Sequence, residues 1–101
     1  MSAYEKTFDV DQDIENIVEY TARNWGHNQV RRYIAGLEEK LSDLAANRTY
    51  YKSHDHLGDG IISARYEHHF IFALKRENEP LLILANFHER MELMKRLQSR
   101  L

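Results

Sequence analysis

Two amphipathic segments separated by one short break constrain the fold of this chain more than any other feature. Apolar side chains recur at helical spacing on both sides of the break: Ile14, Ile17, Val18 and Thr21 before it, then Val30, Tyr33, Ile34, Leu37, Leu41 and Leu44. Trp25, the only tryptophan, and Gly26 stand in the break. Two stripes so close in the chain can be buried only against each other and a third surface. The spacing therefore predicts a helical hairpin in which Ile17 and Leu37 are buried.

The hairpin is expected between a short edge strand and a loop. Residues 4–8 are typical of an edge strand, and Asp9 with Gln12 resembles a capping box at the start of the first helix. The first helix then extends to about residue 24 and the second from about 28 to 46. We expect Trp25 to pack on Tyr20 or Tyr33 at the hairpin corner, with an exposed partner anchor as the alternative. Residues 47–60 are polar and rich in turn formers, which favours a loop with little regular structure.

Three strands and a last helix follow in the prediction. The strands span residues 61–66, 69–75 and 81–87, and short links between neighbours favour an antiparallel meander. The third is almost continuously apolar, which is typical of a central strand covered on both faces. The last helix spans about residues 89–100, with four apolar positions: Met91, Met94, Leu97 and Leu101. We expect this face to pack as core on the sheet, with a partner-binding surface as the alternative. The order βααβββα predicts an α+β fold in two layers, an N-terminal strand and helical hairpin packed on a small antiparallel sheet.

Length and composition limit the possible functions. A chain of 101 residues is expected to form one domain over residues 1–101. Cysteine is absent, so thiol chemistry and disulfides are excluded. The chain starts with charged residues and carries no long apolar run, which favours a cytoplasmic protein without membrane contact. The formal net charge of −2 argues against direct binding of nucleic acid through its phosphates.

The six histidines do not have the spacing of a metal site. Only two close pairs occur, His54 with His56 and His68 with His69, and neither has helical spacing. We interpret His54 and His56 as solvated loop residues. Strand alternation predicts that His68 and His69 face opposite sides of the sheet. No metal and no cofactor are expected.

The residues around the break have the pattern of a known family. The quoted positions are Asp13-Ile14, Ile17, Tyr20-Thr21, Trp25-Gly26, Gln29-Val30, Tyr33 and Leu37, later His69-Phe70-Ile71-Phe72, and finally Phe87-His88 with Met91. At these positions the chain resembles the ParE toxins of bacterial toxin–antitoxin modules, a branch of the ParE/RelE superfamily. The resemblance covers residues 4–97 and implies a RelE/ParE-like fold. It also implies structural roles for His69 and His88.

The resemblance further implies a function by binding. A ParE-like toxin blocks DNA gyrase without cleaving RNA, and a cognate ParD-like antitoxin neutralises it in a hetero-oligomer. We expect the antitoxin to contact the basic C-terminal segment and the neighbouring sheet. The expected contacts are Arg90, Met94, Lys95, Leu97 and Arg100.

Two alternatives remain open at this level. One is a ribosome-dependent mRNA interferase of the RelE type, which needs cations converging on the sheet to act on a phosphate. Its candidate basic site would consist of Lys52, Arg65, His69, His88 and Arg90. The other is a degenerate toxin that serves only as a binding partner.

Overall fold

The computed structural model describes residues 3–101 and confirms the predicted α+β order. The elements are β1 (Tyr4–Lys6), α1 (Phe8–Trp25), α2 (His27–Ala45), β2 (Lys52–Ser53), the 3₁₀ helix η1 (Asp55–Leu57), β3 (Ile61–Tyr66), β4 (His69–Leu74), β5 (Leu81–His88) and α3 (Leu93–Gln98). None of the described helices is both long enough and apolar enough to cross a membrane.

The five strands form one mixed sheet in the order β1-β5-β4-β3-β2. The predicted meander of β3, β4 and β5 is antiparallel, as expected. The edge strand β1 differs because it runs parallel to β5, pairing residues 4–6 with residues 81–83. β5 lies between β1 and β4, which confirms the interior position predicted from its apolar run.

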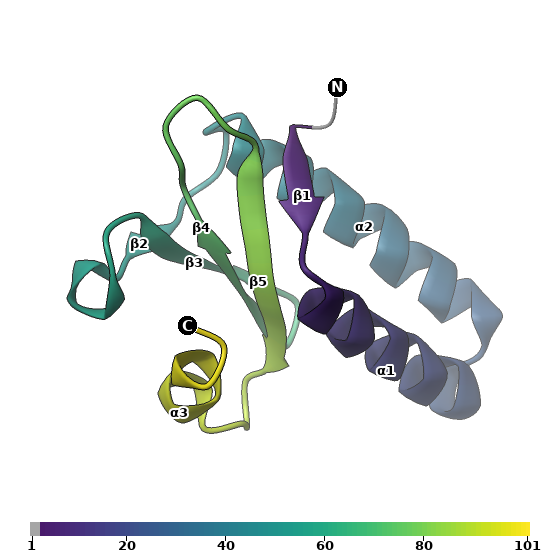
Figure 1. Ribbon diagram of the computed structural model, residues 1–101. Coiled ribbons are helices and arrows are strands. Elements are labelled where there is room, and N and C mark those ends of the chain that lie inside the picture. The colour runs from purple at the N-terminus through teal and green to yellow at the C-terminus, as the bar shows by residue number, and fades with distance from the viewer. Residues whose placement is uncertain (1–2) are drawn as a thin grey trace.

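Helices cover both faces of the sheet (Figure 1). The α1–α2 hairpin packs on one face through a cluster that includes Leu37, Ile62 and Ile71. The short helix α3 packs on the other face, where Leu97 is fully buried beside Phe72 and Phe87. The predicted two-layer arrangement is therefore wrong, because α3 adds a layer on the far side of the sheet.

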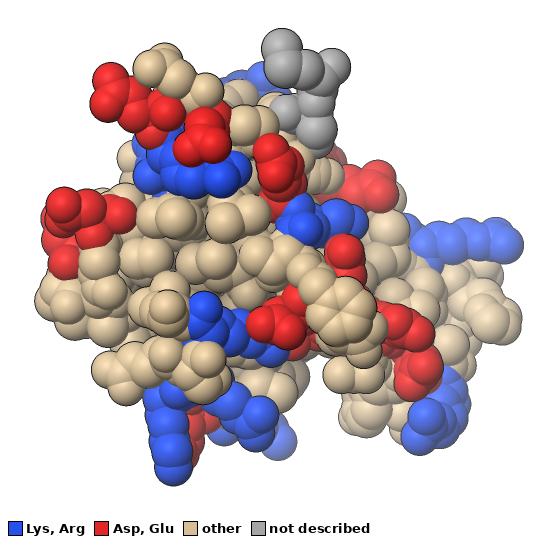
Figure 2. All heavy atoms as spheres, in the orientation of Figure 1, with Lys and Arg blue, Asp and Glu red and all other residues tan. Residues whose placement is uncertain are grey.

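The C-terminal helix is shorter than predicted and buries a different stripe. Residues 89–92 form the connection before α3, and Met91, Met94 and Leu101 remain exposed. Leu93 and Leu97, four residues apart, are the pair that reaches the sheet. Of the four predicted core positions, only Leu97 is buried. In the view of Figure 2, acidic and basic side chains are interspersed around the exposed surface.

Helix α1 begins two residues earlier than the sequence indicated. Thr7, and not Asp9, is the N-cap: its hydroxyl oxygen accepts a hydrogen bond of 3.1 Å from the backbone N–H of Val10. Val10 is fully buried, so the capping bond holds the first turn of the helix against the core. Asp9 lies in the first turn instead, where a carboxylate suits the positive end of the helix dipole.

The hairpin itself agrees with the periodicity in most respects. Gly26 joins the helices with φ of 87°, a conformation that favours glycine. Leu37 is buried as predicted, whereas Ile17 is only partly buried. The stripe of α1 is therefore covered along only part of its width.

Residues 47–60 are more ordered than predicted. They contain β2 and η1, and they fold His54 into the interior. The His54 imidazole Nε2 lies 2.7 Å from the Ser63 hydroxyl, and burial lowers the pKa of His54. The interpretation of His54 as a solvated residue is wrong, while His56 is exposed as expected.

A close approach between β3 and α2 requires a glycine at position 36. The Tyr66 hydroxyl donates a hydrogen bond of 2.9 Å to the backbone carbonyl of Tyr33. A Cβ on Gly36 would overlap the Tyr66 hydroxyl and would lie 3.0 Å from its Cζ. The tyrosine would have to move and lose its hydrogen bond.

We predict that Gly36→Ala destabilises the protein by about 1 kcal/mol or more, because the lost hydrogen bond and displaced ring outweigh the helix propensity of alanine. Without the clash, the same change in a helix stabilises by up to about 1 kcal/mol. Equilibrium denaturation measures the difference. Tyr66→Phe in the Gly36→Ala background removes the hydroxyl and should recover part of the loss. A stabilised Gly36→Ala variant would contradict the close packing described here.

Candidate functional site

An open groove lies between α1 and one end of the sheet. It has a volume of about 920 Å³. Its lining comes from four parts of the chain: α1, the start of α2, the β3–β4 turn, and the end of β5 with the residues that follow. The lining residues are Asp13, Asn16, Ile17, Tyr20, Thr21, Trp25, Gln29, Tyr33, Glu67, His68, His69, Asn86, His88, Arg90 and Met91.

The wall formed by α1 follows from helical periodicity. Asp13, Ile17, Tyr20 and Thr21 recur at intervals of three or four residues, so their side chains lie on one side of the helix. From Asp13 to Trp25 this side extends about 18 Å along the helix axis at the standard rise per residue. Ile17 is only partly buried because its outer side faces this groove.

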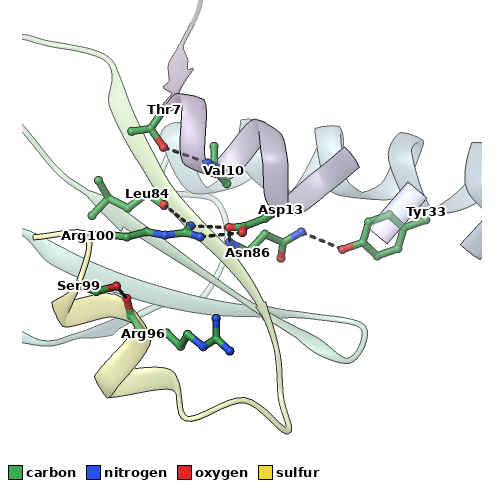
Figure 3. A network of polar contacts seen from close by, with 9 residues as sticks. All are labelled: Thr7, Val10, Asp13, Tyr33, Leu84, Asn86, Arg96, Ser99 and Arg100. Carbon is green, nitrogen blue, oxygen red and sulfur yellow. Dashed lines mark hydrogen bonds and ion pairs between the residues drawn. The ribbon is translucent and has the colours of Figure 1, made fainter. Parts of the chain in front are cut away.

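A buried polar network forms the floor of the groove (Figure 3). The Asn86 side-chain amide donates a hydrogen bond of 2.9 Å to the Tyr33 hydroxyl. The backbone N–H of Asn86 donates to a carboxylate oxygen of Asp13 at 3.0 Å. These two bonds tie β5 to both helices of the hairpin.

Arg100 completes this network from the C-terminal end of the chain. Its guanidinium donates to both Asp13 carboxylate oxygens, at 2.6 and 2.8 Å, and to the backbone carbonyl of Leu84 at 3.1 Å. It also stacks over the Phe87 ring, with Cζ 4.6 Å from the ring centroid. The hydrogen bonds to Asp13 raise the pKa of Arg100 above its ordinary value. The pair is bidentate and mostly buried, the geometry in which an arginine–carboxylate contact is strongest.

Burial keeps the ring groups of the floor uncharged. Desolvation, followed by the neighbouring His88 and His68, lowers the pKa of His69 to about 4, so its imidazole is neutral at pH 7. Desolvation likewise raises the pKa of Tyr33 to about 12. Within residues 3–101, the buried atoms His69 Nδ1 and Asn86 Oδ1 have no hydrogen-bond partner.

Large apolar side chains stand exposed on the rim of the groove. Trp25 is 72% exposed and Tyr20 is 62% exposed, and Met91 on the opposite wall is 42% exposed. The expectation that Trp25 packs into the hairpin corner is therefore wrong, because the corner projects beyond the sheet that would cover it. Exposed aromatic side chains that line one concavity are typical of a surface that binds a partner.

The structure brings together only part of the candidate basic site. His69 and His88 are cross-strand neighbours with ring centroids 5.3 Å apart, and Arg90 lines the groove beside them. Arg65 lies on β3 and is neutralised by an ion pair with Glu89. Lys52 lies on the edge strand β2 and does not line the groove. His69 and His88 face the same concavity, and His68 in the β3–β4 turn lines it too. The predicted opposite orientation of His68 and His69 is therefore wrong, because strand alternation does not apply to a turn residue.

The residues expected to contact an antitoxin fall into two groups. Arg90, Met94 and Lys95 are exposed and accessible to a partner. Leu97 is fully buried against the sheet, and Arg100 is held by Asp13. These last two residues hold the C-terminal segment in place, so a partner would reach them only by displacing it.

Sequence reasoning missed Asn86 and Asn16 as residues of the groove. Asn86 had a usable signal, since it is the one amide in an otherwise apolar strand from residue 81 to 87, and a polar residue there must find a partner. Asn16 had no comparable signal. Among the described residues, no group of three His, Asp or Glu side chains is arranged to hold a metal ion.

Comparison with known proteins identifies similar chains. The model of the family described as ParE toxin of type II toxin–antitoxin system, parDE, matches residues 4–93. The protein Toxin ParE of Escherichia coli is 46% identical over 101 residues, which covers all of this chain and 98% of that protein. The matched range includes every residue that lines the groove.

We predict that Asp13→Asn destabilises the protein by about 1–3 kcal/mol, because it leaves the buried side of Arg100 without a charged partner. Equilibrium denaturation measures the change. Asp43→Asn is the matched control, since Asp43 pairs with an Arg48 side chain that is 64% exposed. That control should cost less than about 1 kcal/mol. Equal losses for the two variants would show that the Asp13–Arg100 contact has no special role.

Proposed function

This chain belongs to the ParE toxin family of type II toxin–antitoxin systems, and we propose that it inhibits DNA gyrase by binding to it. In this proposal the chain acts in the cytoplasm, and a ParD-like antitoxin neutralises it by forming a hetero-oligomer. The toxin contributes a surface, and the stalled enzyme is the source of the growth arrest.

One observation supports action by binding more than any other. The groove places Trp25, Tyr20 and Met91 on its rim, and all three remain exposed in the free chain. Tryptophan and tyrosine are enriched among the residues that dominate binding energy at protein interfaces. A chain of this size gains nothing in stability from leaving such side chains in water. The exposed rim is therefore accounted for by a protein partner.

A second candidate function is ribosome-dependent cleavage of messenger RNA, as in RelE toxins. Its favourable observation is the cluster of His69, His88 and Arg90 in the groove. Two features count against it. His69 has a pKa of about 4 and so carries no positive charge for a phosphate at pH 7. Arg65, which would supply a further cation, is paired with Glu89.

Two assays with the purified wild-type chain separate these functions. We expect loss of supercoiling activity when the chain is added to purified gyrase, and no effect on translation by purified ribosomes. Cleavage of messenger RNA on the ribosome, with gyrase unaffected, would favour the interferase. No effect on gyrase and no effect on translation would favour a degenerate toxin that acts only as a binding partner.

The exposed residues Arg90, Met94 and Lys95 are our proposed contacts for the antitoxin. Apolar contact with Met94 would supply affinity, and the two cations would set orientation and association rate. Leu97 and Arg100 contribute by fixing α3 against the sheet. Deletion of residues 95–101 would remove both of these anchors, so point substitutions are the sharper test.

We predict that Met94→Ser combined with Lys95→Glu weakens antitoxin binding at least tenfold, or about 1.4 kcal/mol. Calorimetry with the purified antitoxin measures the affinity. Lys52→Glu, an exposed charge reversal on β2, is the control and should bind normally. Wild-type affinity in the double variant would place the antitoxin elsewhere, with the helical hairpin as the next surface to test.

A further inference from the structure

The end of the helical hairpin carries an exposed surface, which we call the hairpin tip and which shares Tyr20 and Trp25 with the rim of the groove. It consists of Tyr20, Arg23, Trp25, Arg31 and Arg32, all exposed. A Cβ built on Gly26, at the turn between the helices, meets nothing within 4 Å, so the turn faces open space. In Figure 1 the two helices extend together beyond the sheet toward this turn. The tip is therefore convex and free of cover from the described chain.

The charged residues of the tip are all positive. From residue 20 to residue 37 the sequence contains Arg23, Arg31 and Arg32 and no aspartate or glutamate. Basic side chains project from the hairpin side of the molecule in Figure 2. The chain as a whole has a formal net charge of −2, so this positive surface is local.

The tip cations make no ion pair or hydrogen bond with the described residues. Four of the six arginines elsewhere have carboxylate partners, namely Arg48, Arg65, Arg76 and Arg100, whereas Arg90 and Arg96 form no ion pair with the described residues. Arg23 has a local explanation, because it lies in the last turn of α1, where a cation suits the helix dipole. Arg31 and Arg32 have no such explanation, since no acidic residue stands three or four positions from either one.

Aromatic side chains accompany these cations. Trp25 and Tyr20 are the two most exposed large apolar residues on the second half of α1. Arg23 follows Tyr20 by three residues and so lies beside it on the helix surface. Tryptophan, tyrosine and arginine are the residue types most enriched at the centres of protein interfaces.

We propose that the hairpin tip inserts into an acidic recess on the target enzyme and supplies the inhibitory contact. This inference rests on the proposed function, since it takes gyrase as the target. A convex tip fits a recess on a large folded partner better than it fits a flexible peptide, which needs a groove. The acidic character of the recess follows from the three unpaired arginines.

A protein partner fits the tip better than nucleic acid does. Binding of a nucleic-acid strand uses a positively charged groove that follows the backbone over several phosphates. The tip is a projection, and the concavity beside it has Glu67 and a neutral His69 on its lining. A single-stranded oligonucleotide is therefore the probe for the opposite outcome.

Two tip residues allow a test that leaves the groove unchanged. Arg31 and Arg32 do not line the groove, and both are exposed. The double variant Arg31→Glu and Arg32→Glu should therefore fold normally. Trp25→Ala is a second variant, which removes an aromatic side chain that the tip shares with the groove rim, without changing charge.

The experiment measures gyrase inhibition by the full chain and by each variant in a supercoiling assay. We expect the concentration for half inhibition to rise at least tenfold for both, with unchanged thermal midpoints. Antitoxin affinity should remain within twofold of wild type for the double arginine variant. Arg48→Glu with Lys52→Glu reverses two exposed charges away from the tip, and this control should inhibit normally.

The alternative outcomes each overturn the inference in a different way. Normal inhibition by both tip variants, with an active wild type, would overturn the tip and leave the proposed function intact. A loss of antitoxin affinity without loss of inhibition would assign the tip to the antitoxin. Binding of a 12-nucleotide single strand that the arginine variant abolishes would assign it to nucleic acid. A wild-type chain inactive on gyrase would overturn the proposed function and this inference together.

Discussion

The carboxylate of Asp13 connects three parts of the chain that are far apart in sequence. It accepts hydrogen bonds from the backbone N–H of Asn86 on β5 and from the two terminal guanidinium nitrogens of Arg100, while its own backbone belongs to α1. A mostly buried carboxylate must be paired in this way, because an unpaired one would bear the full cost of desolvation. The contact therefore fixes where α1 crosses the sheet and where the C-terminal segment ends.

This arrangement leaves one end of the sheet open. α1 and α2 cover one face, and the segment held by Arg100 covers the other. Beyond Asp13 the two layers separate, and the space between α1 and the ends of β4 and β5 is the groove. The groove and its exposed rim thus result from the same contact that stabilises the fold. The proposed binding surface therefore lies beside a rigid anchor, which would limit the entropy lost when a partner is ordered on it.

The arginines of this chain include one that is paired and faces inward and several that are exposed without a partner among the described residues. Arg100 faces inward, contacts Asp13 and stacks on Phe87. Arg23, Arg31 and Arg32 face outward and have no partners among the described residues, and the exposed Arg90 stands on the groove wall. Outward cations add little to stability, but they accelerate association with an acidic surface and select against a basic one. The chain belongs to a family of toxins from toxin–antitoxin systems. Unpaired cations on its surface are consistent with a protein that binds partners.

The sequence by itself determined the elements, their order and the interior position of β5, because apolar periodicity reports which side of each element must be covered. It also marked Asp13, Tyr33, His69 and His88 through a family pattern, without indicating that they converge on one groove. Only the tertiary structure decided the capping by Thr7, the burial of His54, the exposure of Trp25 and the inward direction of Arg100. Periodicity defines an apolar face but not how far the surface that covers it extends. Whether a tryptophan at the end of a helix is buried, or an arginine near the end of the chain is paired, depends on residues tens of positions away.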